Sequence, residues 1–162
     1  MIDLNLKDSK LVIENIEKLR AKGSINDLPA ILDYLTAPSN PEVEKALYNF
    51  IFDIKDPKAV DPIIAAIQND KYLPIQKKLI EMCWQSSLKF SKHIALFVDL
   101  LINGDFEIAF EALTVIENME ETLDPKSKEQ EMAKLKNAIS TVREDRKGWL
   151  HEAFHFIEQA AE

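Results

Sequence analysis

The sequence predicts an all-α fold, an α-solenoid built from stacked antiparallel helix pairs. Apolar residues recur three and four positions apart, as on one face of a helix, and no segment alternates as a half-buried strand would. Asn-Pro at 40–41 and Asp-Pro at 124–125 have the form of an N-cap followed by a first-turn proline, and Gly23 and Gly104 suit helix ends. These signals predict helices at 9–21, 26–36, 41–54, 58–69, 73–88, 91–102, 106–122, 126–145 and 149–161.

An internal repeat determines the predicted architecture. Apolar positions keep one register across three units at offsets of 32–34 residues: Leu28, Val60 and Ile94 in the first helix of each pair, and Leu47, Leu79 and Ala112 in the second. A pair of amphipathic helices cannot bury its apolar face alone, so the copies are expected to stack. We therefore predict an N-terminal tail at 1–8, helical repeats at 9–122, and a capping helix pair at 123–162, where the register breaks.

The same periodicity predicts which side chains form the core. The repeats are expected to bury Leu47, Leu79, Ile80, Met82, Leu100 and Val115, and the last helix is expected to bury Trp149, Ala153, Phe156 and Ile157. Cys83, the single cysteine, occupies a core position of its helix. A buried structural thiol is therefore expected there, and a nucleophile is not.

Residues 56–70, DPKAVDPIIAAIQND, resemble the first helix and turn of a HEAT-like repeat, of the short type grouped with bilin-lyase repeats. Proline recurs inside the first helix at Pro29 and Pro62, as that family prefers. The resemblance covers about residues 25–122. It implies a superhelix of about three repeats with terminal capping helices, whose second helices line a concave binding face.

On that face the expected solvent positions are Lys45, Asn49 and Phe52, then Lys77, Glu81 and Trp84, then Phe110, Thr114 and Glu117. Phe52 and Trp84 are equivalent residues of successive second helices, and both lie away from the core stripe. Aromatic rings bordered by lysine are typical of a protein-binding surface. The alternative is a wider apolar face that tucks both rings under a neighbouring helix. We predict a partner-binding site at the first six positions.

Residues 151–155, His-Glu-Ala-Phe-His, match the HExxH signature of zinc metalloproteases. His151 and His155 would share one helical face and could bind a zinc ion, and Glu152 could act as base for a bound water. A catalytic zinc needs a third protein ligand, and Glu158 and Ala161 stand where the metzincin extension requires Gly and His. We expect a solvated polar stripe at this motif, with no catalytic residues, no metal site and no cofactor.

Charge is unevenly distributed near the C-terminal end. Residues 105–124 contain seven acids and no Lys or Arg, whereas residues 126–147 contain seven bases against four acids. The favoured interpretation is that the two segments lie side by side and neutralise each other; the alternative is an acidic docking strip for a basic partner.

The predicted function is a non-catalytic interaction module that presents a concave helical surface to a protein or peptide. The alternatives are a minimal zinc hydrolase and a nucleic-acid-binding HEAT-like protein. Nucleic acid is an unexpected partner because the net charge is −8 and the predicted groove is not basic. The chain has no signal-like N-terminus and no apolar run of membrane-spanning length, so we expect a cytoplasmic protein without a membrane partner.

Overall fold

The computed structural model describes residues 4, 8–22, 25–38 and 40–161 of the chain. Every regular element in these ranges is helical, which confirms the all-α prediction. The α-helices are α1 (Ser9–Lys22), α2 (Leu28–Leu35), α3 (Pro41–Phe52), α4 (Val60–Ile67), α5 (Gln76–Gln85), α6 (Ile94–Asn103), α7 (Phe106–Glu117), α8 (Pro125–Ile139) and α9 (Glu144–Gln159). Three 3₁₀ turns precede α4, α5 and α6: η1 (Pro57–Ala59), η2 (Asp70–Ile75) and η3 (Ser91–His93). The predicted tail at 1–8, apart from Leu4 and Asp8, and Gly23 lie outside the described ranges.

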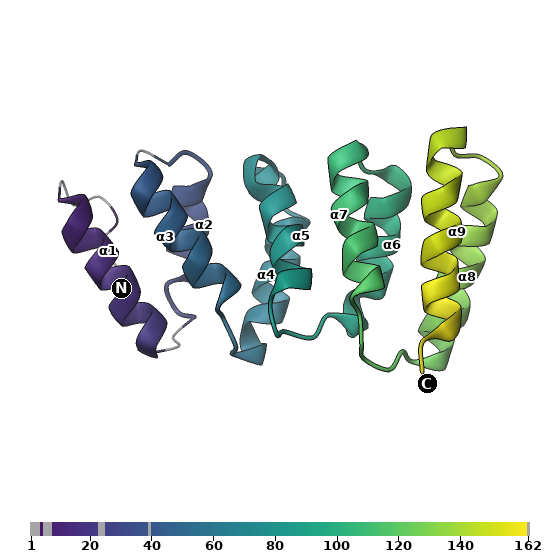
Figure 1. Cartoon of the computed structure of the whole chain (residues 1–162), viewed down its shortest axis with the longest axis horizontal. Helices are drawn as coiled ribbons and strands as arrows, with labels where there is room; N and C mark the ends of the chain where they lie inside the picture. The colour runs from purple at the N-terminus through teal and green to yellow at the C-terminus, as the bar shows by residue number, and fades with distance from the viewer. Residues whose placement is uncertain (1–3, 5–7, 23–24, 39, 162) are drawn as a thin grey trace. The chain divides into compact units, whose positions relative to one another are not determined.

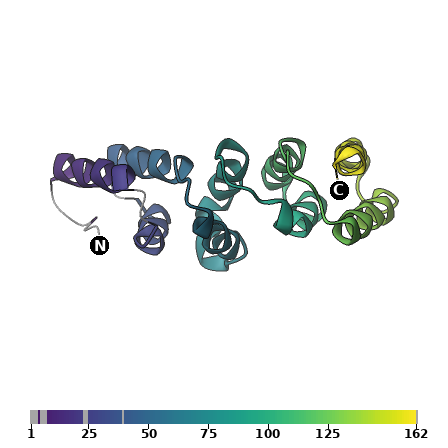
Figure 2. The same ribbon diagram turned by 90° about the horizontal axis from the view of Figure 1, so that it is seen from below.

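The chain divides into two compact units, residues 1–88 and residues 89–162. Within unit 1, α3 contacts α1, α2 and α5, and α4 pairs with α5 (Figure 1). Within unit 2, α6 pairs with α7 and α8 pairs with α9 (Figure 1). Figure 2 shows that α7 and α9 form one layer of unit 2 and that α6 and α8 form the other, in agreement with the contacts between these helices. The predicted capping pair α8–α9 thus packs directly on the helix pair before it.

Helices α3, α7 and α8 each begin after a residue whose side chain caps the helix. The side chain of Asn40 accepts hydrogen bonds from the backbone amides of Glu42 and Val43, at 2.9 and 3.2 Å. Asp105 and Asp124 act in the same way at the starts of α7 and α8. Each carboxylate or amide oxygen satisfies amides that have no partner within the helix. The N-caps predicted at 40 and 124 are confirmed.

The predicted core is confirmed except at one position. Leu47, Leu79, Ile80, Met82 and Val115 are buried, whereas Leu100 is only half-buried. In α6 the buried face consists of Ile94, Phe97, Val98 and Leu101. Leu100 lies next to that face, at the edge of the apolar stripe, where a helical pattern does not separate core from boundary.

The boundary between the last two helices was predicted wrongly. We expected a break near Gly148, but α8 ends at Ile139, α9 begins at Glu144, and Gly148 lies inside α9. The hydroxyls of Ser140 and Thr141 donate to the carbonyls of Asn137 and Ala138, at 2.7 and 3.1 Å. These local bonds accompany the end of α8, because short hydroxyl side chains satisfy carbonyls that the helix leaves open.

The predicted buried face of the last helix was also partly wrong. Ala153 and Ile157 are buried as expected, but the third buried residue of α9 is Leu150. Trp149 is only half-buried, and Phe156 is 41% exposed. The apolar residues of α9 extend beyond the stripe that packs against α8, α7 and α6, so the rings of Trp149 and Phe156 remain partly at the surface.

None of the helices in the described part of the chain is long and apolar enough to cross a membrane.

Candidate functional site

The predicted site residues lie on α3 and α5, which contact each other within unit 1. Four of the six are half-buried: Phe52, Lys77, Glu81 and Trp84. The other two, Lys45 and Asn49, are exposed. The two aromatic positions are therefore neither core residues nor fully solvated ones. Phe52 and Trp84 are thus intermediate between the two alternatives, rings exposed on the surface and rings tucked under a neighbouring helix.

A third ring on α3 belongs to this surface and was not predicted. Tyr48 stacks on Phe52 with ring centroids 6.3 Å apart and an interplanar angle of 29°. Burial raises the pKa of the Tyr48 hydroxyl, and the negative charges of Glu44 and Glu81 raise it further. Because Glu81 lies on α5, the two helices meet at this ring. The sequence did contain a signal for this contact, because residues four positions apart on a helix, such as Tyr48 and Phe52, are neighbours on its surface.

A larger exposed aromatic group lies on α7 and α9 in unit 2. Phe106 and Phe110 are 64% and 50% exposed, and the half-buried ring of Trp149 contacts both. The ring centroids lie 5.0 Å apart for Phe106–Trp149 and 5.9 Å apart for Phe110–Trp149. We call Phe106, Phe110 and Trp149 the aromatic cluster. The sequence predicted solvent exposure for Phe110 only, because Trp149 was assigned to the buried face.

Local structure explains how the aromatic cluster is held at the surface. Asp105 caps α7 by accepting from the amide of Ile108 at 2.9 Å, so Phe106 begins the helix and Phe110 follows one turn later. On α9 the guanidinium of Arg146 lies over the Trp149 ring, 5.5 Å from its centroid. The same guanidinium donates to the carbonyls of Leu101 and Gly104 at 3.2 and 3.1 Å, which ties α9 to the end of α6. The cation–π contact and both hydrogen bonds hold the tryptophan in a defined position.

A pair of carboxylates lies further along the same two helices. The carboxyl group of Glu117, at the end of α7, lies close to that of Glu152 on α9. Burial raises the pKa of the Glu117 carboxyl, and the nearby charge and hydrogen bond of Glu152 raise it further. Two carboxylates in contact cannot both ionise without a repulsion that a bound cation would relieve.

The Glu117–Glu152 contact involves the HExxH motif. Its glutamate, Glu152, faces Glu117, while both histidines are exposed. Gln159 Nε2 lies 2.9 Å from Nε2 of His155, and Nδ1 of His155 lies 3.8 Å from Glu158. Among the residues that the structure describes, no three His, Cys, Asp or Glu side chains come together as metal ligands would.

We predict that His155→Ala leaves the free energy of unfolding within about 0.5 kcal/mol of the wild-type value, because the side chain is a surface residue of α9. Metal analysis of the purified chain is expected to find substoichiometric zinc, with no difference between wild type and variant. One tightly held zinc per chain that survives chelator treatment and disappears in His155→Ala would contradict this prediction and favour the hydrolase.

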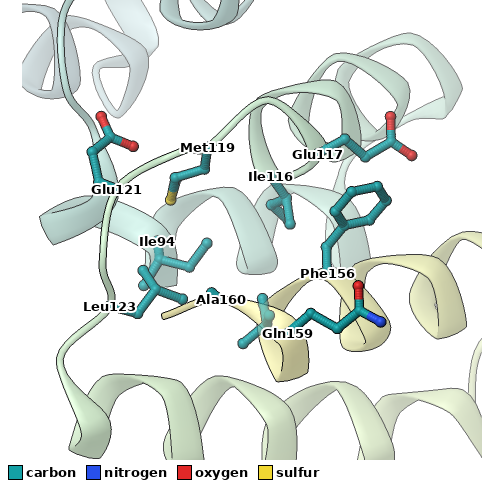
Figure 3. Close-up of a pocket in the computed structure, with 10 residues that line it drawn as sticks. Ile94, Ile116, Glu117, Met119, Glu121, Leu123, Phe156, Gln159 and Ala160 are labelled. Carbon is teal, nitrogen blue, oxygen red and sulfur yellow. The ribbon is translucent and has the colours of Figure 1, made fainter. Parts of the chain in front are cut away.

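A cavity of about 220 Å³ opens where α7 and α9 end. Its wall is mainly apolar and includes Ile94, Ile116, Met119, Leu123, Phe156, Ile157 and Ala160, with Glu117, Glu121 and Gln159 as polar members. Figure 3 shows the carboxylate of Glu117 next to the ring of Phe156, and the carboxylate of Glu121 at the other end of the cavity. We call this the α7–α9 cavity. No sequence pattern pointed to it, because it forms from three separate stretches of chain.

The two oppositely charged segments of unit 2 belong to different helix pairs. We predicted that 126–147 would neutralise 105–124, and this stays a prediction: α8 packs on α6 and α9, whereas residues 144–147 of the basic segment belong to α9, which packs on α7. Lys134 of α8 contacts Asp99 of α6 at 2.9 Å and Glu131 of its own helix at 2.8 Å. The charge of Lys134 is therefore paired with α6 and with its own helix.

A second cavity of about 420 Å³ lies in unit 1, between the end of α1 and the segment after α3. Arg20 and Asp53 form an ion pair at its edge, and Glu17 contacts the same guanidinium. Both partners of Arg20 are supplied by the protein itself.

Cys83 is buried as predicted, and its thiol lies 3.2 Å from the carbonyl of Leu79. Burial raises the pKa of this thiol far above its ordinary value. A thiol in that state does not form the thiolate that nucleophilic chemistry requires.

Searches against protein-family models, curated proteins and solved structures found no match to this chain.

Proposed function

We propose that this chain is a non-catalytic helical-repeat protein, an α-solenoid of HEAT-like type, that binds a protein or peptide on the second helices of its pairs. The shared register of the apolar positions supports the repeat architecture, and so does the pairing of helices within each unit. The observation that carries the binding function is the exposure of Phe106 and Phe110 beside Trp149.

Exposed aromatic rings in contact with one another favour a docking surface for a physical reason. Rings that are half or more exposed give up the hydrophobic free energy that burial would supply, about 25 cal/mol per Å² of apolar area. A cluster of them on one face is typical of a surface that a partner covers. Tryptophan and tyrosine are also enriched among the residues that contribute most to protein interfaces. Trp149 with its two phenylalanines fits that description.

The α3–α5 surface of unit 1 supports the same function with less exposed area. Tyr48, Phe52 and Trp84 are half-buried there, and the exposed Lys45 and Asn49 border the rings of α3. Lys77 and Glu81 supply charged groups from α5. The partner-binding proposal therefore includes Lys45, Asn49, Phe52, Lys77, Glu81 and Trp84, with the aromatic cluster of unit 2 as the principal anchor.

The test is capture of binding partners by the immobilised full chain, with the double variant Phe106→Ala/Phe110→Ala as the probe. Removing two anchor rings is expected to weaken binding by about 2 kcal/mol or more, which corresponds to roughly a 30-fold loss of affinity. The proteins captured by wild type would be identified, and their affinities would be measured for both forms.

The matched control is Leu73→Ala, which removes a side chain that is 56% exposed in unit 1 and lies outside both surfaces. This variant is expected to bind like wild type. Phe52→Ala/Trp84→Ala reports whether the α3–α5 surface contributes, and we expect a smaller loss there. Unchanged affinity in the Phe106→Ala/Phe110→Ala variant would refute the proposed binding surface.

A further inference from the structure

The α7–α9 cavity has the size of a receptor for one side chain. A water molecule occupies about 30 Å³ in the liquid, and pockets for drug-sized ligands enclose roughly 300–1,000 Å³. At about 220 Å³ the cavity lies between these limits. Its apolar wall, with Phe156 41% exposed at the edge, suits a long side chain with an apolar stem.

The charges around the cavity favour a cation. Glu117 and Glu121 line it, and Glu152 contacts Glu117 from α9. Helix α7 ends at Glu117, so its last carbonyls add partial negative charge. Lys128 donates to the carbonyl of Ala160 at 2.8 Å and offsets the corresponding charge at the end of α9. Helix α6 begins at Ile94 and contributes the opposite partial charge. The cavity lining itself carries two carboxylates and no cationic side chain.

We propose that the α7–α9 cavity receives an arginine side chain of the partner segment, with the guanidinium beside Glu117 and Phe156 and the methylene stem along Ile116 and Met119. This inference rests on the proposed function and names the chemistry of the partner. Arginine fits better than lysine because a guanidinium is less strongly hydrated than an ammonium and therefore loses less on entering an apolar wall. Its plane also stacks on an aromatic ring and donates in parallel to a carboxylate.

The aromatic cluster and the cavity lie on the same helix at a defined separation. Phe106, Phe110 and Glu117 follow one another along α7, and at 1.5 Å per residue the first and last are about 16 Å apart. An extended peptide covers that length in about five residues at roughly 3.3 Å each. The partner segment is thus expected to carry an apolar anchor and an arginine about five residues apart.

The direct test uses small probes of the side chain, titrated into the isotopically labelled full chain and followed by the amide resonances of residues 94–160. Butylguanidinium represents arginine, butylurea is its neutral isostere, and pentylammonium represents lysine. Butylguanidinium is expected to shift resonances around the cavity with millimolar affinity, at least tenfold more tightly than butylurea and more tightly than pentylammonium.

Two variants distinguish the proposed arginine site in the cavity from the proposed partner-binding surface at the aromatic cluster. Glu117→Gln/Glu152→Gln removes the like-charge contact, so it is expected to fold at least as well as wild type while losing tenfold or more in affinity for butylguanidinium. Phe106→Ala/Phe110→Ala is expected to leave probe binding unchanged, because it alters only the aromatic cluster. In the Phe106→Ala/Phe110→Ala variant, unchanged affinity for both the probe and the captured partner would refute the aromatic binding surface. It would leave the proposal for the cavity intact.

Several results would overturn the arginine assignment. Equal binding of butylurea would show an apolar cavity without charge recognition, and tighter binding of pentylammonium would assign lysine. Unchanged affinity in the double glutamine variant would remove Glu117 and Glu152 from the site. Self-association of the chain that butylguanidinium reverses would identify a second copy as the occupant and contradict a separate partner.

Discussion

Replacing Phe97 with alanine is expected to lower the free energy of unfolding of unit 2 by about 3–5 kcal/mol. Phe97 is fully buried in α6, and its ring meets the ring of Phe90 edge-on, with centroids 6.3 Å apart. Truncation removes the transfer free energy of the ring and leaves a cavity that the surrounding helices fill only in part. Because small domains are stable by only about 5–15 kcal/mol, the variant should be close to unfolding in mild denaturant.

Phe110→Ala is the matched control, since it removes the same side chain from the neighbouring helix at a position that is 50% exposed. Its expected cost is below about 1 kcal/mol, the usual size of one aromatic pair contact. Urea unfolding should be followed through resonances of α6–α9, because the two units are not required to unfold together. Comparable losses for the two variants would show that Phe110 belongs to the core and would remove the aromatic cluster as an exposed surface.

Gly104→Ala is expected to destabilise unit 2 by about 1–3 kcal/mol. Gly104 lies at the end of α6, as the sequence predicted, and its backbone there is extended, with φ −67° and ψ 163°. The requirement is instead one of space. A methyl group at position 104 would lie 2.5 Å from the carbonyl oxygen of Leu100 and 2.7 Å from Cγ2 of Ile108. One of these neighbours must move, and the carbonyl is part of the α6 backbone.

Gly148→Ala is the paired substitution and should have the opposite sign. Gly148 lies within α9, and no neighbouring atom lies within 4 Å of the position that the methyl group would take. Alanine in a helix interior is favoured over glycine by about 0.5–1 kcal/mol, because glycine loses more backbone entropy. Thermal unfolding of both variants measures the contrast. Stabilisation by Gly104→Ala, or a loss in Gly148→Ala, would contradict the packing described at these positions.

The surface residues show how far the sequence could lead to the candidate site. Lys45 and Asn49 are exposed as the helical pattern predicted, and Phe110 is exposed as well. Trp149 and Phe156 were wrongly assigned to the buried face of α9. The apolar face of this helix is wider than the area that neighbouring helices cover, and the sequence pattern does not show which edge of the face they leave exposed. Which edge of the apolar face is covered depends on where the neighbouring helices of unit 2 pack on α9.

The helical class, most of the helix positions and most of the core follow from local patterns in the sequence. Periodic apolar residues and capping side chains act over a few residues, so their effect can be read locally. Only the tertiary structure brought Trp149 between Phe106 and Phe110, and only it joined Glu117 to Glu152. The α7–α9 cavity likewise arises where three stretches of chain meet. Such contacts depend on how whole helices pack, and this is decided by the sum of many weak side-chain contacts and not by the order of residues within any one helix.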